Sequence, residues 1–598
     1  MTPSDDATKS ATKRPVRIAN FSGFYGDRRH TARGMIEGGP VDVITGDYLA
    51  ELTMLILWKA RQRDSSAGYA KTFLADVEEI LGTCLDRNIK IVANAGGLNP
   101  AGLVEQISLL ADRLGLSPRV AYVTGDDILD RVPELQASGI DLAHLDDGRP
   151  LSASGTTPVA ANVYLGGWGI AEGLAAGADI VVAPRVTDAS VVVGPAAWWH
   201  GWQRDDWNQL AGAVVAGHVL ECGPQVTGGN YPFLDEIVDP GYPGFPIAEI
   251  AADGSSVITK HEGTGGLVSI GTVTAQLLYE IKEPAYLNPD VITHFDSIVV
   301  DQVDTNRVRL SGTRGGPPPE TLKVSMNYVG GYRNTMTVVL TGLDIEPKAK
   351  RVTNLLFGLL GGRDQYAESD VRLLRFDHAD AESNPEATAH FQITVKDPDE
   401  AKVGRRFSDA VIALSIASIA GFHTTTPPVP AKQYGVFWPA LIPRDLVTHR
   451  VVLPDGIEIV VPHSQGSEIS PRPVTAPVVL EKPEDSGPST TVPLGRLVGA
   501  RAGDKGGNAN VGVWVRDKSA WGWLDHTLTV ERFKELIPET HDLEVLRYRL
   551  PNLGALNFVV VGLLEEGVAS ATRPDPQAKG LGEYLRSRLI DVPGDLLS

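Results

Sequence analysis

Only two cysteines, Cys84 and Cys222, occur in the 598 residues of the sequence. A disulfide framework is therefore not expected, and a reducing cytoplasm is the predicted location. Positive charge is scarce as well, because 54 lysines and arginines stand against 74 aspartates and glutamates, for a formal net charge of -20. This excess of negative charge argues against binding to nucleic acid or to an anionic membrane surface, since both require a positive field.

Long apolar runs are also missing. No stretch approaches the roughly 18–20 apolar residues that cross a bilayer, so no membrane-spanning segment is expected. The first residues, MTPSDDATKSATKR, are polar and lack an apolar centre, and we expect residues 1–14 to be a disordered tail rather than a signal peptide. The remaining composition, 42% hydrophobic and 21% charged, is typical of a globular protein with a large core.

Short apolar runs alternate with helical patterns in the first part of the chain. The runs lie at residues 16–19, 41–45, 89–93, 119–123 and 179–183. Each run ends in a loop of glycine or polar residues, and this succession predicts an α/β domain with a parallel sheet over residues 15–250. Ligands of such sheets bind beyond the carboxyl ends of the strands, so the polar loop residues are expected to gather along one edge.

The pattern changes after residue 250. Alternating strand-like runs, among them 322–328 and 335–341, with helices expected near 347–361 and 403–420, indicate an α+β domain over residues 251–462. Residues 463–490 are rich in proline, serine and glutamate and are expected to be a linker. Residues 491–598 begin with strand patterns again and predict a small third domain.

A glycine-rich stretch from Gly166 to Gly229 is the most distinctive part of the sequence. It contains GGWGIAEGLAAGADIVVAPRVTDAS and, further on, GHVLECGPQVTGG. Small residues allow the backbone to approach a ligand closely, and polar side chains placed among them can converge on one cavity. This mixture predicts a functional site.

Five polar residues are candidates for catalysis. Asp47, Asp188 and Glu221 are candidate acid–base groups, because carboxylates in glycine-walled clefts can have raised pKa values. Asp47 and Asp188 could equally cap the helices that follow them. Cys222, with His218 nearby, is a candidate nucleophile, and the alternative is a packed thiol, as we expect for Cys84. A zinc site would need three or four ligands, and no metal site is predicted from this group.

Five further residues are candidates for substrate binding: Arg28, Asn94, Gly96, Gly97 and Arg185. Either arginine could clamp a carboxylate or phosphate, and Arg185 is better placed because it follows a predicted strand; the alternative is a salt bridge to a neighbouring acid. The loop NAGGLNP (94–100) could offer backbone N–H groups to an anion or form a plain tight turn. It is neither a dinucleotide fingerprint nor a P-loop, so no cofactor is assigned.

Several of these motifs together resemble those of a known family. They are SGFYGDR (22–28), TGDYLAELTM (45–54), NAGGLNP (94–100), NVYLGGWGIAEGLAAGADIV (162–181), RVTDAS (185–190), GHVLECGPQVTGGNY (217–231) and HEGTGGLV (261–268). The chain resembles the acyclic terpene utilisation protein A family over nearly its whole length after residue 15. ARAGDKGGNANVGVWVR (500–516) resembles the small C-terminal domain of that family, which implies a ferredoxin-like fold for residues 491–598. From its residues alone, segment 504–508 is a second ligand loop or a hairpin at a domain interface.

The resemblance implies a place in metabolism. The family is similar to proteins encoded with genes for the catabolism of citronellol- and geraniol-type terpenes and related branched acids, in cytoplasmic pathways that proceed through CoA thioesters. We therefore expect an enzyme that acts on a small-molecule substrate, an acyl-CoA or an organic acid, by a lyase, hydratase or acyl-transfer reaction. The alternative is a non-catalytic partner or scaffold for other enzymes of such a pathway.

Tryptophan is concentrated in one short stretch of the chain. It contains Trp168, Trp198, Trp199, Trp202 and Trp207, which is more aromatic surface than one strip of core needs. Because aromatic residues are enriched in subunit interfaces, we expect a homo-oligomer. The alternative is that these rings pack within the chain.

Overall fold

The computed structural model describes residues 13–239, 241–466 and 488–597. Most of the predicted tail and most of the predicted linker lie outside these ranges. The chain forms two compact units. One comprises Met1–Asn327, Phe437–Val568 and Gln577–Ser598, and the other comprises Tyr328–Val436 and Ala569–Pro576.

The first unit is built on a mixed sheet that has eleven strands within the described ranges. Its middle consists of five parallel strands, β1 (Val16–Ser22), β2 (Val43–Gly46), β3 (Lys90–Ala93), β6 (Ile180–Val182) and β4 (Val120–Thr124), in this order. Parallel neighbours require crossover connections, and the helices between the strands provide them. The predicted α/β fold with a parallel sheet is therefore confirmed.

Antiparallel strands extend this sheet on both sides. Outward from β1 they are β7 (Pro246–Ile250), β8 (Ser256–Lys260), β12 (Arg307–Ser311) and β11 (Val299–Asp304), and outward from β4 they are β19 (Arg450–Val452) and β20 (Glu458–Val460). The predicted domain boundary at residue 250 thus falls inside one sheet. An alternating pattern identifies a strand but does not say which sheet the strand joins.

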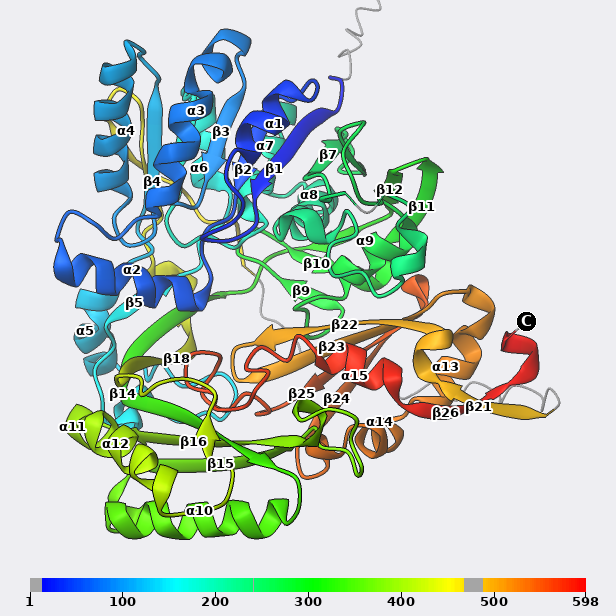
Figure 1. Ribbon diagram of the computed structural model, residues 1–598. Helices are drawn as coiled ribbons and strands as arrows, with labels where there is room; N and C mark the ends of the chain where they lie inside the picture. The colour runs from blue at the N-terminus through cyan, green and yellow to red at the C-terminus, as the bar shows by residue number, and fades with distance from the viewer. Residues whose placement is uncertain (1–12, 240, 467–487, 598) are drawn as a thin grey trace, which may run out of the picture. The chain divides into compact units, whose positions relative to one another are not determined.

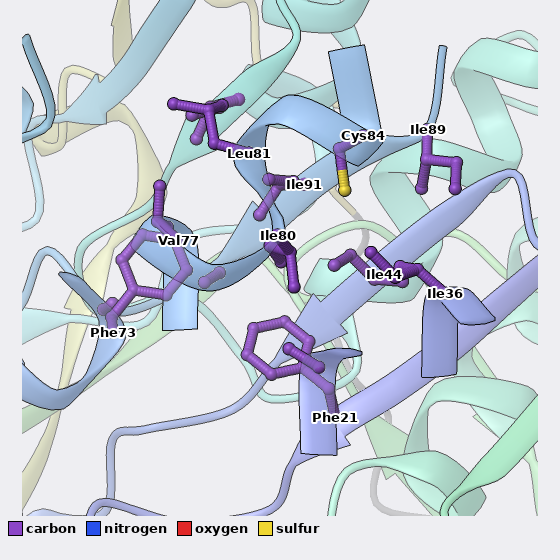
Figure 2. Packing of buried hydrophobic residues seen from close by; sticks show 14 of the residues in the cluster. Phe21, Ile36, Ile44, Phe73, Val77, Ile80, Leu81, Cys84, Ile89 and Ile91 are labelled. Atoms are coloured by element: carbon purple, nitrogen blue, oxygen red, sulfur yellow. The ribbon is translucent and has the colours of Figure 1, made fainter. Parts of the chain in front are cut away.

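One face of the parallel strands is covered by α1 (Thr31–Glu37), α3 (Lys71–Arg87) and α4 (Pro100–Leu114). The side chains that meet there include Phe73, Val77, Ile80 and Cys84 from α3 and Phe21, Ile44 and Ile91 from the strands (Figure 2). The helix residues recur at the spacing of one helical face, and the strand residues alternate with side chains that point away. The Cys84 thiol belongs to this core, and burial raises its pKa to about 12, as expected for a packing residue.

The other face carries α6 (Trp168–Ala175), α7 (Ser190–His200) and α8 (Trp207–Leu220) (Figure 1). Several glycines of the stretch 166–229 allow these helices to pack closely. A Cβ on Gly167 would lie 2.8 Å from the backbone nitrogen of Gly194, and one on Gly217 would lie 2.8 Å from the Cα of Ala189. Only glycine allows backbones to approach so closely, so these glycines do not leave a cleft open.

The tryptophan-rich stretch also contributes to packing within the chain. Trp202 is buried, its ring stacks on His200 at 5.3 Å, and its Nε1 donates to the carbonyl of Ala252 at 2.9 Å. Trp198 and Trp199 form an edge-to-face pair at 6.0 Å. The oligomeric state stays a prediction.

A long strand, β14 (Thr321–Thr341), replaces two predicted ones. The prediction of separate strands at 322–328 and 335–341 was wrong, because two glycines in the middle of β14 continue the strand. Gly331 has a φ of +125°, and a Cβ on Gly330 would lie 2.4 Å from the ring of Tyr434. Within the first unit the beginning of β14 pairs with β5 (Ala160–Val163).

The second unit has an α+β fold of its own. The distal part of β14 pairs with β16 (Thr388–Asp397), which pairs with β15 (Glu368–Arg375). The helices α10 (Ile345–Leu360) and α12 (Arg405–Ala413) share an apolar core with these strands. Both predicted helices are present, although the second ends at Ala413 rather than near residue 420.

The C-terminal part of the first unit contains a four-stranded antiparallel sheet. Its order is β22 (Val498–Lys505), β23 (Asn508–Val515), β25 (Ala555–Val560) and β24 (Val545–Leu550). The helices α13 (Trp521–Thr527), α14 (Val530–Leu536) and α15 (Leu581–Ser587) contribute to its core.

This sheet is fastened to residues 278–282 of the same unit by two asparagines. Asn510 accepts from the backbone N–H of Glu280 at 2.8 Å and donates to the carbonyl of Leu278 at 3.1 Å. Asn557 donates to the carbonyl of Lys282 at 2.7 Å. These bonds hold Glu280 at a φ of 56°, which is unfavourable for a residue with a side chain.

A substitution at Gly512 of β23 tests how closely this strand packs against residues 278–282. A Cβ there would lie 2.4 Å from the Cβ of Leu278, so we expect Gly512→Ala to lower the stability of the protein by about 1–3 kcal/mol. Gly522 of α13 is the matched control, since a Cβ there has open space, and Gly522→Ala should not lower the melting temperature. Equal melting temperatures for the two variants would contradict this account.

Candidate active site

The carboxyl ends of the parallel strands bring the first predicted site residues together. Asp47 directly follows β2, and Asn94 directly follows β3. The Asn94 Nδ2 donates to Asp47 Oδ1 at 2.6 Å, and its Oδ1 accepts from the backbone N–H of Tyr48 at 2.7 Å. The side chain of Asn94 therefore fixes the Asp47 carboxyl in one orientation.

Arg185 enters the same region from the end of β6. It is buried, and its Nη1 donates to the carbonyl of Leu49 at 2.6 Å and to Asp188 Oδ1 at 2.9 Å. The guanidinium lies 4.3 Å from the centre of the Tyr164 ring. The salt bridge to a neighbouring acid, which was the alternative for this residue, is the arrangement observed. The Asp188 side chain is 34% exposed, so the pair links a buried cation to solvent.

Glu221 reaches the cluster from the end of α8. One turn earlier lies His218, whose Nδ1 is 3.1 Å from Glu221 Oε1. The contact lacks the alignment of a hydrogen bond, and neither ring nitrogen of His218 has a hydrogen-bond partner among the described residues. Burial lowers the pKa of His218 to about 4, so its ring is neutral at pH 7. The rings of Tyr286 and Phe295 pack against it at 5.4 and 5.5 Å.

Two carboxyl groups of the cluster have strongly raised pKa values. Burial raises the pKa of Asp47 and that of Glu221, and the nearby carboxylate of Asp188 raises both further. The hydrogen bond from Asn94 opposes the shift at Asp47 but does not cancel it. In both groups burial therefore favours the protonated form, and the Asp188 side chain beside them accepts a hydrogen bond from Arg185.

Cys222 lies next to these carboxyl groups, but it is not a thiolate. Burial raises its pKa well above the ordinary range, and the neighbouring Glu221 raises it further. Its place depends on Gly23, because a Cβ there would lie 2.7 Å from the carbonyl carbon of Cys222. This contact explains why the loop after β1 needs glycine where it meets the loop after α8.

Three predicted binding residues lie apart from this cluster. Arg28 is exposed, and its guanidinium stacks on Tyr242 at 4.3 Å. Gly96 donates its N–H to the carbonyl of Ala183 at 3.0 Å, and Gly97 has a φ of +51°. Both glycines thus belong to a tight turn, which was the alternative for this loop. The other seven candidates form one cluster through direct or electrostatic contacts. They are Asp47, Asn94, Arg185, Asp188, His218, Glu221 and Cys222.

Sequence reasoning missed an ionic pair on the solvent side of Arg185. Tyr164 donates its hydroxyl to Glu51 Oε1 at 2.9 Å, and the Nζ of Lys323 lies 3.8 Å from the same oxygen. Burial alone would raise the pKa of Glu51, but the charges of Lys323 and Arg185 outweigh it and lower the pKa to about 2. Glu51 and Tyr164 lie in quoted motifs, whereas nothing in the sequence around Lys323 indicated this role.

The hairpin between β22 and β23 is also part of the cluster. Arg501 hydrogen-bonds the side chain of Gln225 in the loop after α8 and lies over the ring of Tyr279 at 4.5 Å. Lys505, at the end of β22, lies with its Nζ 5.7 Å from the centre of the Tyr286 ring. Segment 504–508 is thus a hairpin at an interface within the first unit.

A separate cavity of about 10 Å³, enough for one water molecule, lies elsewhere in the first unit. Its polar lining includes Asp290, Arg444, His449 and His463, and none of the predicted site residues lines it. Across the described ranges, no group of three or more histidine, cysteine, aspartate or glutamate side chains has the arrangement of a metal site.

Comparison with protein families adds a name to this architecture. A family model described as acyclic terpene utilisation family protein AtuA matches residues 16–453. The chain belongs to this family. A second model, described as the AtuA ferredoxin-like domain, matches residues 492–591 and confirms the predicted C-terminal fold. Membership implies a role in acyclic terpene utilisation. A search of curated proteins finds no match. Among the described helices, none has the length and apolarity to cross a membrane.

The raised pKa of Glu221 leads to a prediction about stability. Glu221→Gln replaces a carboxyl group whose charged form is disfavoured by burial with a neutral group of similar volume, and we expect a change of less than about 1 kcal/mol. Asp188→Asn removes the anion beside buried Arg185 and should cost more, about 1–3 kcal/mol after allowance for its partial exposure. Thermal unfolding of the two variants checks this order.

The pH dependence of stability gives an independent check. The pKa of Glu221 is raised in the folded protein, so the wild type keeps a proton that the unfolded chain releases. Stability must therefore fall as the pH rises from the ordinary range of a glutamate toward the folded value. Glu221→Gln should make this decline shallower, and an unchanged slope would show that Glu221 is already ionised.

Proposed function

We propose that the protein is an enzyme that acts on an acyl-CoA or an organic acid in acyclic terpene or branched-chain acid utilisation. The reaction would be of the lyase or hydratase type and would proceed by acid–base chemistry. The observation that carries this proposal is the pair of buried carboxyl groups with raised pKa values, Asp47 and Glu221, beside the ion pair of Asp188 and Arg185.

Such a set provides both roles that a lyase or hydratase needs. These reactions give a proton to one atom of the substrate and remove one from another. Environments that push the pKa values of neighbouring carboxyl groups apart create a donor and an acceptor within one site. Asp47 and Glu221 would be the donors, and Asp188, which reaches solvent, would be the acceptor.

Acyl transfer through Cys222 has less support. A nucleophilic cysteine needs a lowered pKa or an adjacent base, and the pKa of Cys222 is raised by burial. The nearest imidazole, that of His218, lies against Glu221 instead. We therefore assign Cys222 and His218 to the wall of the site.

Unsatisfied buried polar groups favour an enzyme over a scaffold. The nitrogens of His218 and the Nε of Arg185 are buried without hydrogen-bond partners in the described part of the chain. Each such group costs about 1–3 kcal/mol, which a packing surface would avoid and a bound substrate would recover.

Growth on citronellol, in cells where it depends on this gene, tests the proposal. Glu221→Gln and Asp47→Asn should each slow growth severely, because general acid–base catalysis contributes about 10²- to 10⁴-fold. Glu262→Gln removes a carboxylate from an exposed position and serves as the matched control. Normal growth of both site variants, with protein levels equal to wild type, would refute acid–base catalysis and favour the scaffold.

A further inference from the structure

The face that β22 turns toward residues 279–286 carries two cations and a glycine. Arg501, Gly503 and Lys505 alternate along the strand and therefore share one face. A Cβ on Gly503 would lie 2.4 Å from the Tyr279 ring, so this glycine lets the strand approach. The hairpin thereby brings the ammonium group of Lys505 to the Tyr286 ring.

Most of the cations around the site have a carboxylate partner. Arg185 is paired with Asp188, Lys323 with Glu51, and Lys579 with Glu280 at 3.8 Å. Lys505 forms no ion pair with any carboxylate in ranges 13–239, 241–466 and 488–597.

Both neutral and charged side chains lie around Lys505. Its charge adds to the effect of burial on the pKa of His218 and opposes the rise in the pKa of Glu221, and the charge of Glu280 acts on the same two groups with the opposite sign. The His218 ring is neutral, burial disfavours the charged form of Glu221, and Tyr286 offers its ring. Lys505 is half-buried, and within the described ranges no carboxylate lies at ion-pair distance to compensate the lost hydration of its ammonium group.

We infer that Lys505 binds an anionic oxygen group of the substrate, a carboxylate or a phosphate. The inference rests on the proposed function for the identity of the site, and it adds the class of ligand and the contribution of the C-terminal hairpin. Arg501 acts as a positioning residue, because its bond to Gln225 holds the loop after α8 against the hairpin. Lysine suits this role as a point charge that accepts either kind of oxygen anion.

Binding of defined probes to the full-length protein tests the inference. Isothermal titration would use 3-methylbutanoate, its uncharged amide, inorganic phosphate and CoA. Wild type should bind 3-methylbutanoate if the anion is a carboxylate, or phosphate and CoA if it is a phosphate, and it should not bind the amide. Lys505→Gln should weaken that binding roughly 10- to 100-fold, and Lys505→Arg should largely restore it.

Lys518→Gln is the matched control, since it removes the same charge from an exposed position of the same domain. The inference is wrong if Lys505→Gln binds the probes as wild type does, if Lys518→Gln weakens binding equally, or if no charged probe binds wild type at millimolar concentration. Equal melting temperatures for Lys505→Gln and wild type would exclude a loss of fold.

The outcome is separable from that of the proposed function. Glu221→Gln should keep probe binding while growth is lost. If Glu221→Gln grows normally and Lys505→Gln still loses binding, the anion site stands and the acid–base assignment fails.

Discussion

The buried guanidinium of Arg185 is the interaction on which the site depends. It joins the end of β6 to the carbonyl of Leu49, to the Tyr164 ring and to Asp188. Together with Lys323 it lowers the pKa of Glu51, and its Nη1 donates a hydrogen bond to the carboxylate of Asp188. That carboxylate in turn raises the pKa values of Asp47 and Glu221. Burial is the main cause of both shifts, and the charge of Arg185 itself opposes them.

Close backbone approach is the second constraint, and it explains the glycines of the motifs. Gly23 allows the loop after β1 to meet Cys222, and Gly167 allows α6 to meet α7. Gly503 and Gly512 do the same for the C-terminal sheet and residues 278–282. The glycine-rich stretch first indicated a site, but most of its glycines are needed for close packing of the backbone. The polar residues between the glycines form the cluster.

The sequence allowed the parallel sheet and its edge to be predicted, because strand–loop–helix order dictates where Asp47, Asn94 and Arg185 must lie. The sequence could not decide whether the loop with Gly96 and Gly97 is a tight turn or an anion-binding loop, since both need the same residues. Lys505 lies far from the other residues of the cluster in the chain, and only tertiary packing brings it there. The division between catalytic and structural roles within the cluster stays a prediction.

The asparagine bonds from the C-terminal sheet to residues 278–282 have a consequence for biosynthesis. A ribosome completes the strands that carry Asp47, Asn94 and Arg185 long before it makes Asn510 and Asn557. Until Asn510 emerges, the hydrogen bond that its side chain accepts from the backbone N–H of Glu280 cannot form. The nascent chain therefore carries the cluster without the two cations of β22, and it acquires Arg501 and Lys505 only when the C-terminal sheet has been made.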